Sequence, residues 1–245
     1  MTDVFIGRGP NLGANTTAAS TQTSYADAPE VRERLVNDAQ ALIARYPQPR
    51  SALLPLLHLV QSEEGHVTGD GIAFCAELLG LSTAEVSAVS TFYSMYKSRP
   101  VGDYHVGVCT NTLCAVLGGD EIFATLKAHL AVGNDERTPD GKHERSLTLE
   151  HIECNAACDF APVMTVNWEF FDNMTPEKAR RLVDDLLADR PVIATRGPAV
   201  CSFRETERIL AGFEDRREDA VRGGGSAGPE SLVGLRIAQA RGETA

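Results

Sequence analysis

The hydrophobic residues between positions 27 and 98 recur at the spacing of amphipathic helices. Apolar positions three and four residues apart predict helices over 27–46, 51–64 and 70–79, and a fourth begins after residue 82. Two of these helices open with a capping box, in which the N-cap side chain and the residue three positions later satisfy each other's backbone N–H groups. The boxes are Asp27 with Glu30 and Ser82 with Glu85. This part of the chain is therefore predicted to be a small helical bundle.

The pattern changes to alternating apolar and polar residues after about residue 99. The predicted elements are a strand over 104–108, a helix over 121–130, a polar loop over 133–145, a strand over 146–153, a hairpin of 163–167 with 168–173, and a helix that Thr175 and Pro176 open. This order predicts a compact α/β domain with helices packed on a small sheet. The fold class of the whole chain is α+β.

Four regions follow from these patterns. Residues 1–26 form a polar tail that we expect to be disordered, 27–98 the helical domain, 99–190 the α/β domain, and 191–245 an extended C-terminal tail. The tail contains a short amphipathic piece at 205–213, a glycine linker at 223–226, and a last stretch, 229–240, expected to be helical only against a partner. We expect order to weaken beyond residue 191 and the extension to dock on a partner.

The charge balance narrows the function classes. The chain has 245 residues and a net charge of −11, with no basic run, which argues against a nucleic-acid binder. No apolar stretch approaches the roughly 18 to 20 residues that a transmembrane helix needs. The first residues do not resemble a secretory signal. The sequence thus predicts a protein of the reducing cytoplasm, where six cysteines are expected to be ligands or core residues and not disulfides.

Four of the cysteines form two close pairs. Cys109 and Cys114 have the spacing C-x4-C, and Cys154 and Cys158 the spacing C-x3-C. Each pair follows a predicted strand, so two adjacent strands would bring all four sulfurs to one edge of the sheet. Buried thiolates need a positive charge beside them, which a metal supplies. Zinc and a [2Fe–2S] cluster both remain open on spacing, although the wider pairs and the small residues around them favour the cluster.

The other candidate residues carry weaker signals. Cys75 lies at helical spacing with apolar neighbours and is predicted to be a core residue, and Cys201 has no cysteine or histidine nearby. His105 and His151 lie on predicted strands near the cysteines and are interpreted as strand residues, with redox tuning as the alternative. No glycine-rich nucleotide motif occurs, so the chain is not expected to bind NADH or ATP itself.

Several segments together resemble the thioredoxin-like [2Fe–2S] ferredoxin family over about residues 30–190. The resemblance is carried by the segments around both cysteine pairs, 104–114 and 153–164, and by 46–57 and 89–96 upstream. It implies that Cys109, Cys114, Cys154 and Cys158 hold one [2Fe–2S] cluster in a thioredoxin-like domain. One departure is Asn155-Ala156 after the third cysteine, where the family often has Leu-Gly.

The resemblance also implies a function. We expect an electron-transfer subunit of NADH–quinone oxidoreductase, respiratory complex I, in the peripheral arm at the cytoplasmic face of the plasma membrane. FMN and NADH are expected on a partner subunit, a large iron–sulfur subunit is expected as a second partner, and no direct insertion into the membrane is expected. The alternatives are the equivalent subunit of an NAD(P)-linked hydrogenase or formate dehydrogenase, and a zinc-stabilised interaction module.

Overall fold

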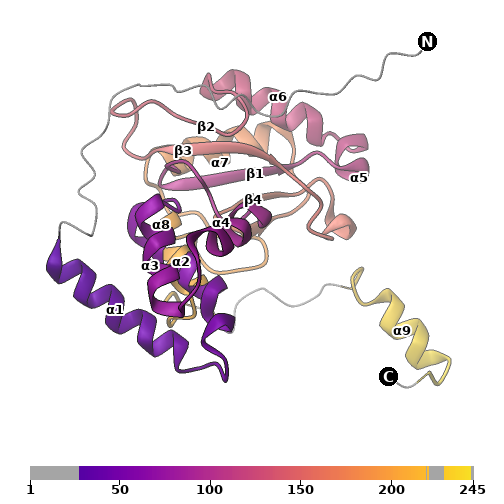
Figure 1. Cartoon of the computed structure of the whole chain (residues 1–245). Helices are drawn as coiled ribbons and strands as arrows, with labels where there is room; N and C mark the ends of the chain where they lie inside the picture. The colour runs from indigo at the N-terminus through magenta and orange to yellow at the C-terminus, as the bar shows by residue number, and fades with distance from the viewer. Residues whose placement is uncertain (1–27, 219, 221–228, 244–245) are drawn as a thin grey trace, which may run out of the picture.

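The computed structural model describes residues 28–218, 220 and 229–243. Figure 1 shows a group of helices on one side of a five-stranded sheet, with further helices on the other side. The predicted tail 1–26, the predicted capping residue Asp27 and the glycine linker 223–226 lie outside the described residues. The N-cap of the first helix is Ala28 with no side-chain cap, so the predicted Asp27–Glu30 capping box is wrong. The predicted fold class, helices followed by an α/β sheet, is confirmed.

The first helices follow the predicted pattern closely. They are α1 (Pro29–Ile43), the 3-10 helix η2 (Pro49–Ala52), α2 (Leu53–Glu64), α3 (Gly69–Leu79) and α4 (Thr83–Phe92). The capping box of α4 is present, because the Glu85 backbone N–H donates to Ser82 Oγ and the Ser82 N–H donates to the Glu85 carboxylate. Their apolar faces form one core, which includes Leu56, Leu57 and Cys75.

The sheet has the strand order β2-β3-β1-β4-β5, with β1 at its centre. The strands are β1 (Tyr104–Cys109), β2 (Glu136–Arg137), β3 (Leu147–Ile152), β4 (Met164–Val166) and β5 (Glu169–Phe171). β1 and β3 are parallel, and the other pairs are antiparallel. The helices beside the sheet are α5 (Thr112–Val116), α6 (Gly119–Leu130) and α7 (Pro176–Leu187). α5 and β2 were not predicted, since neither is long enough to show a period.

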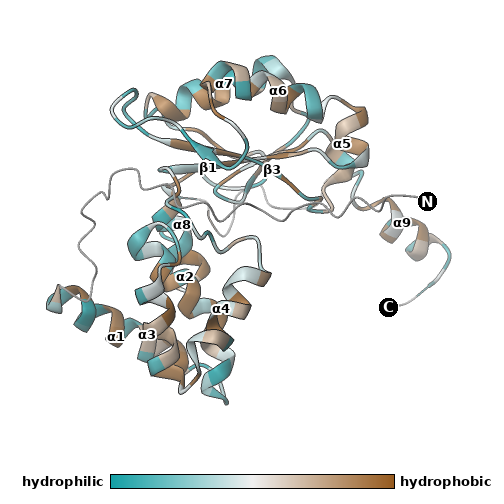
Figure 2. Cartoon of the chain, turned by 45° about the horizontal axis from the view of Figure 1, so that its top comes forward, coloured by the Kyte–Doolittle hydropathy of each residue, from teal (hydrophilic) through white to brown (hydrophobic). Residues whose placement is uncertain are grey.

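The two faces of the sheet differ in polarity. Val106 and Val108 point to the face that α6 and α7 cover, where they join an apolar core. The opposite face carries His105 and Gly107 from β1, Glu150 from β3 and Thr165 from β4. Figures 1 and 2 show that the helical part lies on this second side. The helical domain therefore packs against a face of the sheet that is largely polar.

The C-terminal extension is more ordered up to residue 218 than the sequence suggests. Its helix α8 (Phe203–Leu210) packs against α2, and the Phe203 side chain is buried at the sheet. Glu207 of α8 is fully buried, where its carboxylate lies 2.6 Å from His58 Nδ1 and accepts a hydrogen bond from Trp168 Nε1 at 3.2 Å. The prediction that order weakens from residue 191 is wrong for this part, because long-range contacts hold it.

The last helix, α9 (Val233–Ala240), stands apart from the rest of the structure in both Figures 1 and 2. It has no buried residue, and Val233, Leu235 and Ile237 are all exposed. Within the described ranges, no single helix is long and apolar enough to cross a membrane. Helices α3 and α4 have the length and apolar composition of a membrane span only when they are taken together, and a bend of 119° separates them.

Candidate metal centre

The first cysteine pair is buried at the carboxyl end of the central strand. Cys109 is the last residue of β1, and Cys114 lies in the following short helix α5. Their exposed fractions are only 1% and 2%. Both side chains belong to the same small buried cluster, which places this pair inside the protein.

The second pair lies at the surface beside the first. Cys154 follows the end of β3, and Cys158 begins the 3-10 helix η3 (Cys158–Phe160). Both are exposed, and their Sγ atoms are 3.5 Å apart. Ala156 between them has a φ of 56°, in the left-handed region that favours glycine, and its N–H donates to Cys154 Sγ at 3.4 Å. This backbone explains why the family's preference for glycine applies to this position.

The parallel pairing of β1 with β3 brings the two pairs together. Cys109 is in register with Ile152, two residues before Cys154, so the two loops leave the same edge of the sheet. Ile152, Ala157 and Val163 form a small apolar cluster with Cys109 and Cys114. The predicted adjacency of the two cysteine-bearing strands is confirmed.

Two consecutive glycines allow the first ligand loop to close. Gly118 has a φ of 110°, a conformation that side chains disfavour. At Gly119, a Cβ atom would lie 2.4 Å from the Cys109 carbonyl oxygen and 2.9 Å from that of Cys114. Because α6 starts this close to both cysteines, only glycine leaves them in place.

The thiols are electrostatically coupled. Burial raises the pKa of Cys109 to about 11, an effect that the N–H of Asn111 opposes and that the neighbouring Cys114 and Cys154 reinforce. The hydrogen bond with Cys154 likewise raises the pKa of Cys158. The neighbouring thiols therefore make the ionisation of Cys109 and of Cys158 less favourable, as expected for converging anions without a cation. A metal centre would supply the missing positive charge.

The donor set fits a two-iron cluster. In the part of the chain that the structure describes, no group of three or more His, Cys, Asp or Glu side chains is arranged to hold a metal ion, so the fit rests on the chemistry and pairing of the thiols. The 3.5 Å between Cys154 and Cys158 is close to the separation of two thiolates on one tetrahedral ion, about 3.7 Å for metal–sulfur bonds of about 2.3 Å. Four thiolates in two pairs match the two irons of a [2Fe–2S] cluster.

The remaining cysteines lie elsewhere. Cys75 is fully buried in the helical core, where burial raises its pKa to about 12. Cys201 is half-buried, and its Sγ lies 3.2 Å from Thr206 Oγ1 at the start of α8. His151 is exposed at the edge of the sheet. These residues do not join the two cysteine pairs.

A buried charged cluster was missed by the sequence reasoning. Glu150 Oε2 lies 2.5 Å from His105 Nε2 and 2.5 Å from Lys97 Nζ. Burial lowers the pKa of His105, so the neutral ring donates from Nε2 while its Nδ1 is buried without a partner. Lys97 lies at the end of the helical domain, after α4, whereas the other two residues belong to β1 and β3. The three residues are far apart in sequence and share no periodic pattern, so no local signal could have found them.

Comparison with known proteins agrees with this geometry. The model of the thioredoxin-like [2Fe–2S] ferredoxin family matches residues 39–187. The chain belongs to this family. The match includes the four paired cysteines and ends with the last residue of α7, so α8 and α9 lie beyond the part that defines the thioredoxin-like ferredoxins.

Two relatives of this ferredoxin family extend the comparison. The E subunit of NADH-quinone oxidoreductase from Mycobacterium tuberculosis (strain ATCC 25618 / H37Rv) is 60% identical over 86% of this chain and 81% of its own length. An E subunit of NADH-quinone oxidoreductase from Rhizobium meliloti (strain 1021) is 32% identical over 66% of this chain and 94% of its own length. A solved NAD+-reducing [NiFe]-hydrogenase aligns with a TM-score of 0.48 and 20% identity, covering 55% of this chain and 22% of that one.

Proposed function

We propose that this chain is the electron-transfer subunit of an NADH–quinone oxidoreductase and holds one [2Fe–2S] cluster on Cys109, Cys114, Cys154 and Cys158. The observation that carries the proposal is the convergence of two thiol pairs at the ends of the parallel strands β1 and β3. The family match and the 60% identical mycobacterial relative support it.

The two cysteine pairs would hold the cluster from different environments, one buried and one exposed. Cys109 and Cys114 are buried and anchor it to the centre of the sheet, whereas Cys154 and Cys158 lie at the surface. When bound, the cluster accepts and donates single electrons. The N–H of Ala156 donates toward Cys154 Sγ and offsets part of the negative charge there. The exposed second pair leaves one side of the centre open to an electron-transfer partner.

The partners follow from the role of such a protein. We propose that a partner subunit carries FMN and NADH, that the large iron–sulfur subunit is a second neighbour, and that the assembly lies in the peripheral arm at the cytoplasmic face of the membrane. The mycobacterial and rhizobial relatives, which are parts of NADH-quinone oxidoreductases, support this placement.

The decisive experiment is a visible spectrum of the anaerobically purified chain, with iron, zinc and acid-labile sulfide assayed on the same sample. We expect a reddish protein with about two irons and two sulfides per chain, as a [2Fe–2S] centre requires, which bleaches on reduction. A colourless protein with one zinc would overturn the proposal in favour of a structural metal site.

The ligand set is tested separately by two matched serine variants. Cys154→Ser should perturb or abolish the visible spectrum, because it removes one of the four thiolates. Cys201→Ser should leave the spectrum intact, because Cys201 contacts Thr206 and lies outside both pairs. Bleaching in the Cys201 variant, or an unchanged spectrum in the Cys154 variant, would refute the assignment.

A further inference from the structure

Arg196, in the segment after α7, makes a two-pronged ion pair at the edge of the sheet. Its Nε and Nη2 atoms donate to the two carboxylate oxygens of Asp172, at 2.7 and 2.8 Å. The Asp172 side chain is only 4% exposed, and it follows directly after β5. A bidentate pair of this kind fixes the plane of the guanidinium as well as its position. Arg196 is therefore anchored to the end of the edge strand β5.

The other contacts of the same guanidinium reach the loop that carries the fourth cysteine. Arg196 Nη2 lies 3.7 Å from Asp159 Oδ1, and the guanidinium carbon is 4.9 Å from the centre of the Phe160 ring. Asp159 and Phe160 are the two residues that follow Cys158 in η3. The guanidinium is also 5.2 Å from the ring of Phe170 in β5, so two aromatic rings flank it. Arg196 thus joins the η3 turn to the edge strand.

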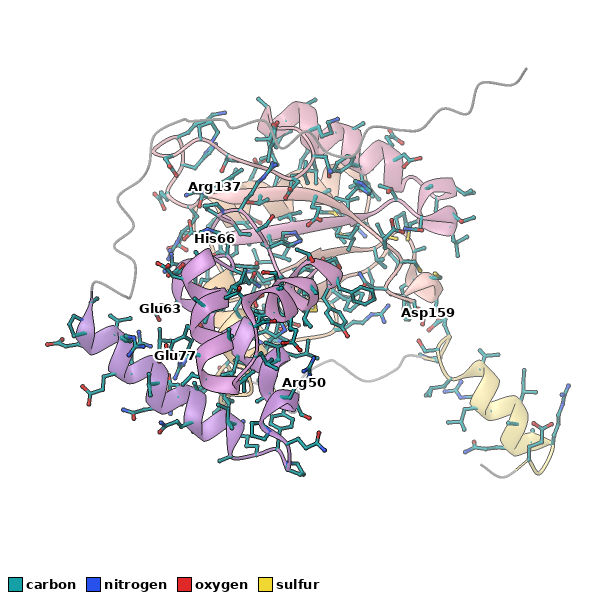
Figure 3. The ribbon with its side chains drawn as sticks, in the orientation of Figure 1. Arg50, Glu63, His66, Glu77, Arg137 and Asp159 are labelled. Carbon is teal, nitrogen blue, oxygen red and sulfur yellow. The ribbon has the colours of Figure 1, made fainter. Side chains whose placement is uncertain are left out.

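Among the described residues, the η3 turn is also attached through its backbone and through the segment before α9. Its side is exposed at Cys158 and Asp159, and the backbone contact that ties it to the edge strand's exit is the Asn173 N–H to the Phe160 carbonyl, at 2.9 Å. Figure 3 shows Asp159 on this turn, facing the segment that leads into α9. Ser231 of that segment also donates its hydroxyl to the Asp159 carboxylate. Residues of the C-terminal extension therefore supply much of what holds the turn.

We propose that Arg196 is a positioning residue for the iron–sulfur centre: it holds the Cys158 turn against the sheet, and its positive charge lies between Asp172 and Asp159, next to the turn that carries the fourth ligand. This inference rests on the proposed function, because it assumes that Cys158 binds the cluster. Arg196 lies beyond residue 187, where the family match ends. The C-terminal extension is thus part of the centre and not only an appendage to it.

The charge and the shape of Arg196 make separate contributions. A cation near a ligand stabilises the more negative, reduced form of the cluster and raises its reduction potential. The flat guanidinium also pairs with Asp172 and packs between two rings, which a lysine ammonium cannot do. Arg196→Gln removes both contributions, whereas Arg196→Lys keeps the charge and loses the planar contacts.

The test compares the full-length wild type, Arg196→Gln, Arg196→Lys and the control Arg190→Gln, all purified anaerobically. Arg190 is a suitable control because it is exposed and its guanidinium pairs with Asp185 of α7, with no ion pair to the η3 turn among the described residues. Two quantities are measured on each: the rate of bleaching by an iron chelator, and the midpoint potential. Far-UV circular dichroism confirms that each variant is folded.

We expect Arg196→Gln to bleach about tenfold faster than the wild type, the usual effect of losing an outer contact of a metal site, and to have a lower potential. Arg196→Lys should bleach faster but keep a potential close to that of the wild type, and Arg190→Gln should match the wild type in both. Wild-type behaviour of Arg196→Gln, or equal effects of Arg190→Gln, would overturn the inference.

Failure of the proposed function would look different. If the wild type itself holds no iron or sulfide, the assignment of the four cysteines fails before Arg196 is tested. If Arg196→Gln does not accumulate as folded protein, Arg196→Lys decides alone, since wild-type bleaching in that variant would overturn a positioning role.

Discussion

The ion pair between Lys97 and Glu150 connects the helical domain to the polar face of the sheet, and its removal is a quantitative test of that packing. Lys97 Nζ lies 2.5 Å from Glu150 Oε2, and the two side chains are 9% and 22% exposed. The backbone of Lys97 is itself fixed, because its N–H donates to Gln61 Oε1 at 2.7 Å. Lys97→Met would keep most of the side chain's apolar stem and remove only its charge.

The size of the stabilisation that this ion pair contributes follows from the pKa of Glu150. Burial by itself would raise this pKa, but the hydrogen bond from His105 and the charge of Lys97 lower it from 4.5 to about 2. A difference of about 2.5 pKa units corresponds to about 3 kcal/mol of stabilisation. Because the folded-state pKa is the lower one, this stabilisation is fully present above pH 4.5 and is lost as the pH falls toward about 2. Lys97 shares it with His105, so at pH 7 we expect Lys97→Met to cost about 2 kcal/mol.

The assay is a double-mutant cycle of Lys97→Met, Glu150→Gln and the double variant, with anaerobic guanidinium unfolding followed by far-UV circular dichroism at pH 7. The cycle isolates the energy of the pair from the effects of each substitution alone. Lys142→Met is the control, because Lys142 is exposed on a loop and should change stability by less than about 0.5 kcal/mol. A coupling energy below about 0.5 kcal/mol, the range of exposed pairs, would refute the reasoning.

Three further substitutions test the metal centre, the buried Phe203 of α8 and the cap of α4. Gly119→Ala should lower the iron content per chain several-fold, because its Cβ would collide with the carbonyl oxygens of both Cys109 and Cys114. The control is Gly234→Ala in α9, where the added Cβ has open space, and it should leave the iron content unchanged. Phe203→Ala should lower the free energy of unfolding by about 3–5 kcal/mol, since the ring is 1% exposed, and an unchanged thermal midpoint would contradict its role. Ser82→Ala should cost about 1 kcal/mol through loss of the α4 capping box, and a cost near zero would show that the cap is dispensable.

Local chemistry is the part of this protein that the sequence alone determined. Helix boundaries followed from residues that are neighbours in the chain, such as Ser82 with Glu85, or Thr175, whose side chain caps α7 as predicted. The spacing of the two cysteine pairs after two strands likewise predicted that they meet, and the parallel pairing of β1 with β3 confirms the adjacency of those strands. Such local patterns can be read from the sequence because three or four neighbouring residues are enough to form them.

Only the tertiary structure decided which distant residues share a site. Lys97 meets Glu150 across 53 positions of sequence, and Arg196 meets Asp172 across 24, with no period linking either pair. The sequence also did not show that the helical domain covers the polar face of β1 and β3, where His105 is fully buried. These residues meet only when the helices pack against the sheet. That packing depends on the whole chain, so no short segment of sequence predicts it.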